Sequence, residues 1–190
     1  ATAPSPRGAR IRLAEKGVAH EPWQVDLGSG EQRGGAYRRS NPRCAVRAVR
    51  TEDGLLLADN AAITAYVEAR YPQPALLGET PAEKAEIASW NWRMEFEGLQ
   101  AIAEALRNSA PAMANRALPG AVDYPQIPAL AERGLLRVGQ FFAMLNERLA
   151  DRNFIATDRF SVADITDVVG VDFAPVVNHK PRTPPQHLLR

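Results

Sequence analysis

Arginine side chains gather in one short stretch of this sequence. Six arginines fall between Arg33 and Arg50, although the 23 basic residues are balanced by 22 acidic ones and leave a formal charge of only +1. The guanidinium group presents a planar fork of donors, so such a cluster favours carboxylates and phosphates as ligands. A solvated basic face is the alternative interpretation of the same stretch.

Two further polar groups stand at expected helix starts. Asp59 and Asn60 precede a helix expected from about Ala61 to Arg70, and both side chains are good N-caps. Ser5 lies in a Pro-rich turn just before a short helix expected over Ala9–Lys16. Unpaired backbone N–H groups and the helix dipole favour anions at such positions.

Composition narrows the class of protein that must position these groups. The chain has 190 residues, is 45% hydrophobic and 24% charged, and carries a single cysteine. These values exclude a disordered tail, a disulfide-stapled scaffold and a Cys-rich metal domain. The three histidines lack metal-ligand spacing, so no metal is expected. With no apolar run long enough for a membrane span or a signal peptide, a soluble protein of the reducing cytoplasm is expected.

The first eighty residues mix short strands with helices. Alternating or apolar runs predict strands over Trp23–Leu27, Val46–Val49 and Leu55–Ala58, and the turn at Gly54 predicts that the last two form a hairpin. This element order lacks a partner strand, and we expect one before Ala1.

The second half is expected to consist of long amphipathic helices. A segment rich in Pro and Gly separates the halves, which predicts a domain over residues 1–74, a linker over 75–80 and a helical domain over 81–190. A third helix is predicted to start at Ser161, where Asp164 completes a variant capping box. The core stripes expected on the first two helices are Ala85, Ala88, Trp92, Phe96, Leu99, Ala103 and Leu106, and Leu135, Val138, Phe142, Leu145 and Leu149.

Several segments in this order resemble glutathione S-transferases of the bacterial cytosolic type. They are Arg10–Gly17, Asn41-Pro42-Arg43, Asp53–Leu57, Asp59–Ile63, Tyr66–Glu68, Trp90–Leu99 and Phe160–Thr166. The resemblance implies an α/β plus all-α protein, with a thioredoxin-like N-terminal domain, an all-helical C-terminal domain and a homodimeric assembly. It also implies an enzyme that depends on Ser or Thr rather than Cys, because Cys44 lies away from the loop that would carry a reactive cysteine.

The resemblance implies a role for each polar group in binding glutathione. Asp59 would pair with the γ-glutamyl ammonium, while Asn60 and the helix-start N–H groups would take the adjacent carboxylate. Val46 would pair with the cysteinyl unit through its backbone. Arg33, with Gln32 as its rival, would take the glycyl carboxylate. A plain N-cap pair, a strand residue and a solvated loop charge are the structural alternatives for these positions.

Ser5 is the implied activator of the glutathione thiol. A hydrogen bond from its hydroxyl to sulfur would favour the thiolate and lower the thiol pKa. A simple helix N-cap is the alternative role for Ser5, and Thr2 and Arg7 are the alternative activators. Two positions depart from the family pattern: Asn60 replaces a usual Ser, and Arg47 replaces a cis-proline before the third strand, where a cis bond would cost roughly 3 kcal/mol.

The function implied is transfer of glutathione to a hydrophobic electrophile held between the domains near Trp92, Arg93 and Phe96. Glutathione would be a co-substrate, and no cofactor is expected. A glutathione-dependent peroxidase, lyase or isomerase would use the same thiolate. A non-catalytic interaction protein with this fold is the other alternative, favoured by Arg47. Neither a nucleic-acid partner nor a membrane is expected. Apart from Tyr37, aromatic residues do not interleave the Arg cluster, as they would in a nucleic-acid site.

Overall fold

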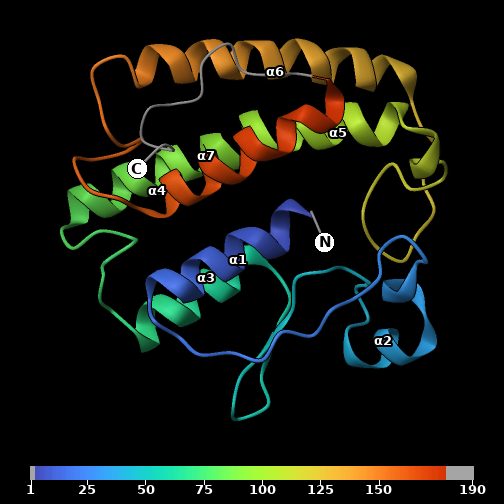
Figure 1. Ribbon diagram of the computed structural model, residues 1–190, viewed down its shortest axis with the longest axis horizontal. Helices are drawn as coiled ribbons and strands as arrows, with labels where there is room; N and C mark the ends of the chain where they lie inside the picture. The colour runs from blue at the N-terminus through green and yellow to red at the C-terminus, as the bar shows by residue number, and fades with distance from the viewer. Residues whose placement is uncertain (1–2, 179–190) are drawn as a thin grey trace. The chain divides into compact units, whose positions relative to one another are not determined.

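The computed structural model describes residues 3–178, which divide into two compact units (Figure 1). Unit 1 holds the chain up to Pro74 together with Leu118–Tyr124, and unit 2 holds the remainder. None of the helices in the described part of the chain is both long and apolar enough to cross a membrane.

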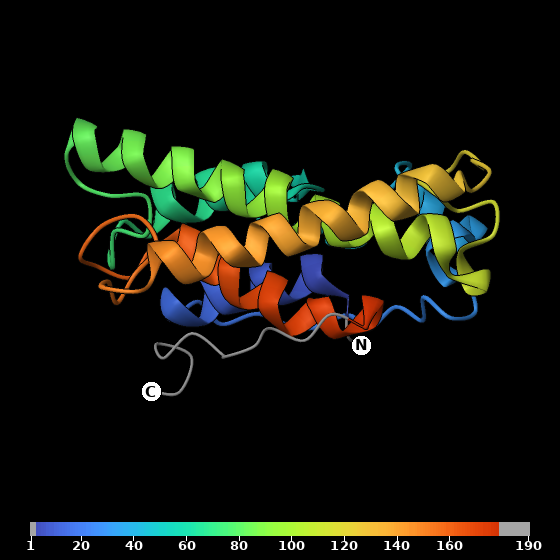
Figure 2. The same cartoon turned by 90° about the horizontal axis from the view of Figure 1, so that it is seen from above.

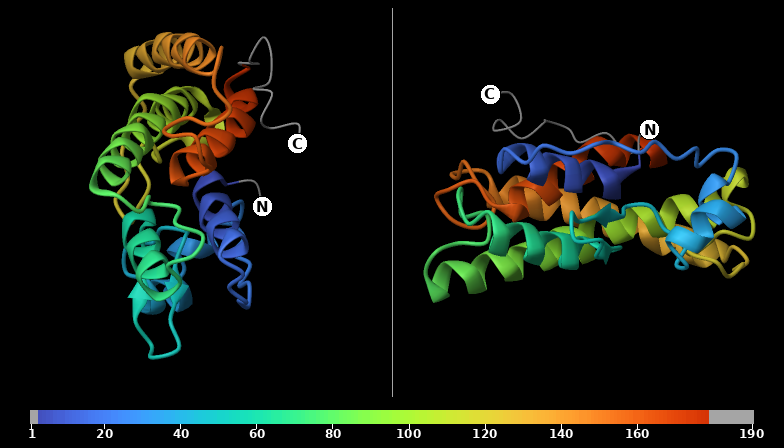
Figure 3. Two further views of the ribbon diagram at one scale, coloured as in Figure 1. Left: turned by 90° about the vertical axis from the view of Figure 1, so that its left-hand side faces the viewer. Right: turned by 90° about the horizontal axis from the view of Figure 1, so that it is seen from below.

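Two helices and a hairpin form the framework of unit 1. The helices α1 and α3 lie side by side (Figures 1 and 3). Their shared core consists of Ala9, Leu13, Leu57, Ile63 and Val67. The elements are α1 (Pro4–Glu15), the 3-10 turn η1 (Glu31–Arg33), α2 (Gly35–Ser40), β1 (Val49–Arg50), β2 (Leu56–Leu57) and α3 (Asn60–Arg70).

Helix α1 begins earlier than its apolar pattern predicts. Pro4 is its first residue, because the proline ring presets a helical φ and the missing N–H would be unpaired at that position anyway. The helix ends as expected before Gly17, whose φ of 63° is left-handed.

The strands of unit 1 are shorter than expected. The hairpin is confirmed, since Val49 pairs with Leu57 and Arg50 with Leu56 in an antiparallel ladder. The strand expected over Trp23–Leu27 is wrong. Its alternation finds no ladder partner, because the backbone N–H of Asp26 instead donates to the Glu31 carboxylate at 2.6 Å and its carbonyl accepts from the Glu31 N–H.

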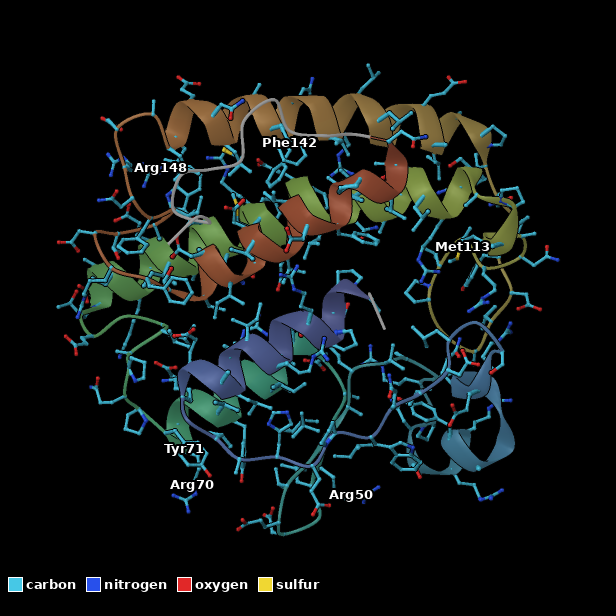
Figure 4. All side chains as sticks on the ribbon, in the orientation of Figure 1. Arg50, Arg70, Tyr71, Met113, Phe142 and Arg148 are labelled. Atoms are coloured by element: carbon cyan, nitrogen blue, oxygen red, sulfur yellow. The ribbon has the colours of Figure 1, made fainter. Side chains whose placement is uncertain are left out.

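Unit 2 is a bundle of helices around one core. Its elements are α4 (Pro81–Arg93), the π-helical segment η2 (Met94–Leu99), α5 (Gln100–Ser109), the 3-10 turn η3 (Pro111–Met113), α6 (Pro128–Arg148), α7 (Val162–Phe173) and the 3-10 turn η4 (Ala174–Val177). The first three elements form one continuous helical rod, and α6 runs along it (Figure 2). Phe142 extends from α6 into the core of this unit (Figure 4).

The core stripe expected on the rod is largely wrong. The structure buries Ile87, Met94 and Ile102, whereas Trp92 is 56% and Phe96 49% exposed. The buried residues Ile87, Met94 and Ala101 recur every seven positions, so the expected stripe had the helical period but lay on the wrong face of the rod.

The stripe expected on α6 is largely confirmed, with Val138, Phe142 and Leu145 buried. Leu135 is exposed because Gly134 is the residue that faces α5. A Cβ atom on Gly134 would lie 2.6 Å from the Ala105 nitrogen, so only glycine permits this close approach of the two backbones.

The start of α4 supplies a prediction about acid stability. The Glu83 carboxylate accepts from the N–H groups of Thr80 and Glu79 and from Arg159, and these bonds lower its pKa from 4.5 to about 2, the Thr80 bond most of all. The stabilisation that Glu83 provides is therefore complete above about pH 4.5 and is lost as the pH falls through about 2.

We expect Glu83→Gln to reduce the free energy of unfolding at neutral pH. The difference between wild type and variant should shrink as the pH falls from 4.5 towards 2. Urea titrations of both proteins across this range, with the exposed Glu132→Gln as a control, would measure the difference. A stability difference between wild type and Glu83→Gln that stays constant with pH would contradict the role given to the Glu83 charge.

Candidate functional site

The N-terminus of α3 carries the acidic residue expected there. Asp59 is the N-cap, as predicted, and its Oδ1 accepts from the Ala62 N–H at 2.8 Å. Its Oδ2 lies 3.7 Å from Nη1 of Arg43, and the side chain is 42% exposed. One carboxylate oxygen is therefore committed to the helix, whereas the other is accessible to a cationic ligand.

Asn60 is the first residue of α3. Its Oδ1 is buried and lacks a hydrogen-bond partner in the described part of the chain. The backbone N–H groups of Asn60 and Ala61 also have no partner within residues 3–178. Rotation of the Asn60 amide by half a turn would place its Nδ2 donors where Oδ1 now lies. This helix end thus offers several donors suited to a carboxylate.

The loop before β1 presents the backbone of Val46. The Tyr37 hydroxyl and the buried Asn41 amide both donate to the Ala45 carbonyl, at 2.8 and 2.7 Å. Val46 itself lies in a bend rather than in the expected strand, and its N–H and carbonyl have no partner among the described residues. The peptide bond before Arg47 is trans, because among the described bonds only Gln73-Pro74 is cis.

Arg33 already has an anionic partner. Its Nη2 donates to Oδ1 of Asp123 at 2.5 Å and to the Ala121 carbonyl at 3.3 Å. Both partners belong to the Leu118–Tyr124 segment of unit 1. Gln32, the alternative ligand, is buried.

Ser5 lies inside α1 rather than before it. It is the second helical residue, and Ala3 is the N-cap, so the alternative N-cap role for Ser5 is wrong. Pro4 causes this shift by starting the helix one residue earlier. The Ser5 hydroxyl has no hydrogen-bond partner within the described structure. Arg7 lies two residues further along α1, and Thr2 falls outside the described residues.

A hollow of about 500 Å³ lies beside the start of α1, and the sequence did not reveal it. Ala3, residues 24–28 and Glu31 line it. The N–H of Gly28 lowers the pKa of Asp26, with the Ser29 hydroxyl as a second cause. The Gly28-Ser29-Gly30 turn was the only sequence signal of this loop.

The aromatic residues expected to hold an electrophile lie on the surface of unit 2. The rings of Trp92 and Phe96 stack with their centroids 4.9 Å apart. Arg93 places its guanidinium 4.5 Å from the centroid of the Trp90 ring and pairs with Glu97 at 3.3 Å. This surface offers flat apolar area next to fixed positive charge.

The structure links some of the predicted glutathione ligands and leaves others apart. The ion pair of Arg43 with Asp59 joins the loop that leads to Val46 with the start of α3. Within residues 3–178, no hydrogen bond or ion pair connects Arg33 or Ser5 to either of these groups. In the same described part, no group of three or more His, Cys, Asp and Glu side chains is arranged to hold a metal ion.

Comparison with known proteins defines the class. No family model matches the chain. The crystal structure of Gtt2 from Saccharomyces cerevisiae superposes with a TM-score of 0.85 at 28% identity, covering 99% of this chain and 89% of that one. A glutathione S-transferase domain-containing protein from Marinobacter aquaeolei superposes with a TM-score of 0.83 at 33% identity, covering 98% and 90%. The fold is therefore that of glutathione transferases, with a thioredoxin-like N-terminal domain and an all-helical C-terminal domain.

The sequence comparison places the chain within that class. Glutathione S-transferase 2 of Saccharomyces cerevisiae is 31% identical over 177 residues, which cover 92% of this chain and 73% of the yeast protein. The chain belongs to the glutathione S-transferase family of enzymes and is similar to Gtt2.

Proposed function

We propose that this protein activates the thiol of glutathione for attack on a hydrophobic electrophile. The observation that supports this most directly is the start of α3, where unpaired N–H groups adjoin the half-exposed carboxylate of Asp59. One end of glutathione carries an ammonium and a carboxylate on the same carbon. Asp59 suits the first group, and the Asn60 amide with the helix-start N–H groups suits the second.

The remaining parts of glutathione are assigned to the other residues. Val46 pairs with the cysteinyl unit through its unpaired backbone groups, and Arg33 takes the glycyl carboxylate. Ser5 donates to the sulfur from the first turn of α1, where the helix dipole also favours a thiolate. The electrophile rests against Trp92 and Phe96, with Arg93 beside them.

The proposed assembly is a homodimer that works in the cytoplasm. Light scattering of the purified protein measures the assembly directly.

Asp59→Asn tests the binding site, because it retains an oxygen that can cap α3 and removes only the charge. We expect it to weaken glutathione binding about tenfold or more, since hydrogen bonds to charged groups contribute about 1.5–3 kcal/mol. Isothermal calorimetry measures the affinity, and Asp53→Asn on the exposed hairpin turn is the matched control. Equal affinity of wild type and Asp59→Asn would overturn the assignment.

Ser5→Ala tests the activation step separately from binding. The variant should bind glutathione normally but leave the thiol pKa near its free value of about 8.5. Ultraviolet absorbance of the bound thiolate across a pH titration measures that pKa. A lowered pKa in Ser5→Ala would remove Ser5 as the activator and with it the Ser-dependent subtype.

A non-catalytic interaction protein is the second candidate, and Arg47 favours it. This residue stands where the family resemblance expects a cis-proline, and the bond before it is trans. A protein that binds no glutathione and conjugates no aryl halide would support this candidate. Peroxidase, lyase and isomerase activities need the same thiolate as glutathione transfer. Assays with a peroxide, an aryl ether and a cis-dienoic acid distinguish these three activities.

A further inference from the structure

The guanidinium group of Arg33 has two ways to bind a carboxylate with a pair of hydrogen bonds. One pair comes from Nη1 and Nη2 at the end of the group, and the other from Nε and Nη2 along its side. Nη2 is common to both pairs and carries two hydrogens, one directed into each. A ligand that occupies both hydrogens therefore blocks both paired arrangements.

Two acceptors of the chain occupy Nη2 in this way. Oδ1 of Asp123 lies 2.5 Å from it, and the Ala121 carbonyl lies 3.3 Å from it. The Nε and Nη1 atoms of Arg33 have no hydrogen-bond partner within residues 3–178. An incoming carboxylate can thus form only single hydrogen bonds with Arg33 until the two acceptors withdraw.

The segment that supplies these acceptors has mostly exposed side chains. Within Leu118–Tyr124, the side chains of Val122 and Tyr124 are exposed, and that of Asp123 is 62% exposed. Few apolar contacts therefore oppose a small displacement of this segment. Gly120, with a φ of 130°, gives its backbone a conformation that other residues rarely adopt.

We propose that Asp123 is an internal competitor for Arg33 and lowers the affinity of the site for the glycyl carboxylate of glutathione. This inference rests on the proposed function, in which Arg33 binds that carboxylate. Asp123 places a like charge at the position of the ligand group and uses the donor that both paired arrangements require. Glutathione must displace the segment to gain a paired contact, so Asp123 lowers the affinity only for ligands with a free carboxylate at that end.

The expected effect is modest, because both partners are partly exposed. Ion pairs of this kind correspond to changes in affinity of up to about fivefold. Asp123→Ala should therefore bind glutathione about two- to fivefold more tightly than wild type. The gain should decrease as salt is added, because exposed charges are screened.

Calorimetric titration at low ionic strength tests the proposal with two ligands. One is glutathione, and the other is its monoethyl ester, in which the glycyl carboxylate is blocked. Asp123→Ala should tighten the binding of glutathione and leave the binding of the ester unchanged. Asp151→Ala, which removes an exposed carboxylate from unit 2, is the matched control and should bind both ligands as wild type does.

The outcomes separate the inference from the function on which it depends. Glutathione binding that is equal or weaker in Asp123→Ala would overturn the competition while leaving the proposed function intact. Equal tightening for both ligands would also overturn it, since the effect would then not involve the glycyl carboxylate. Failure of wild type and Asp123→Ala to bind either ligand would overturn both. Circular dichroism confirms that the variant is folded.

Discussion

Replacement of Asp164 by alanine is expected to lower the free energy of unfolding by about 4 kcal/mol. Asp164 lies fully buried in the first turn of α7. Its Oδ1 accepts from the Ile155 N–H at 2.7 Å. Its Oδ2 accepts from the N–H and the hydroxyl of Ser161, each at 2.8 Å. Alanine would leave both N–H groups buried without a partner, and each such loss costs about 1–3 kcal/mol.

The effect of Asp164 extends beyond the helix that it caps. The Ile155–Ala156 segment is also held by Arg148, which donates to the carbonyls of both residues at 2.8 and 2.9 Å. Arg148 lies at the end of α6 (Figure 4), and its guanidinium is 4.2 Å from the centroid of the Trp90 ring. Loss of Asp164 would therefore loosen the loop that connects α6 to α7.

Urea titration followed by circular dichroism measures the change. Asp164→Asn should lose less stability than Asp164→Ala, because one oxygen remains to accept a hydrogen bond. Asp158→Ala, which removes an exposed carboxylate from the same loop, should lie within about 0.5 kcal/mol of wild type. A loss below about 1 kcal/mol in Asp164→Ala would show that the buried hydrogen bonds are replaced in the variant.

The caps of this fold were predictable from sequence because they depend on nearest neighbours. Ser161 and Asp164 are three residues apart and form the predicted capping box, and Asp59 caps α3 as predicted. The bond from Ile155 to Asp164 spans nine residues, most of them in the irregular loop before α7. Its formation depends on how the loop packs, which no local pattern specifies.

Contacts between distant segments and the choice of the buried helix face were not predictable. Arg33 and Asp123 are 90 residues apart, so no spacing rule connects them. The rod buries the face that carries Ile87, Met94 and Ala101 instead of the expected one, which leaves Trp92 and Phe96 exposed. The alternation of Trp23–Leu27 resembled a strand, yet a strand also needs a hydrogen-bonded neighbour, and the sequence pattern cannot provide that information.

Lys16→Met is expected to lower the free energy of unfolding by about 3–5 kcal/mol. The Lys16 side chain is 1% exposed and lies 2.6 Å from Oε2 of Glu68. Its ammonium also donates to the carbonyls of Tyr71 and Pro74, at 2.8 and 2.5 Å. Methionine preserves the apolar stem but removes the ammonium that Glu68 and the two carbonyls share. Lys84→Met, on the exposed face of α4, is the matched control and should change stability by less than about 0.5 kcal/mol.

The double variant Lys16→Met, Glu68→Leu distinguishes a lost charge pair from lost packing. Replacing both partners by apolar residues removes the Glu68 carboxylate together with its Lys16 partner, and substitution of whole buried ion pairs is often neutral or stabilising. The double variant should therefore recover much of the stability that Lys16→Met loses, short of the contribution of the two carbonyl bonds. Urea titration of the wild type, both single variants and the double variant yields the coupling energy. If the losses of stability in the two single variants simply add, the ion pair does not hold the end of α1 to the end of α3. The two carbonyl bonds alone then hold Lys16 in place.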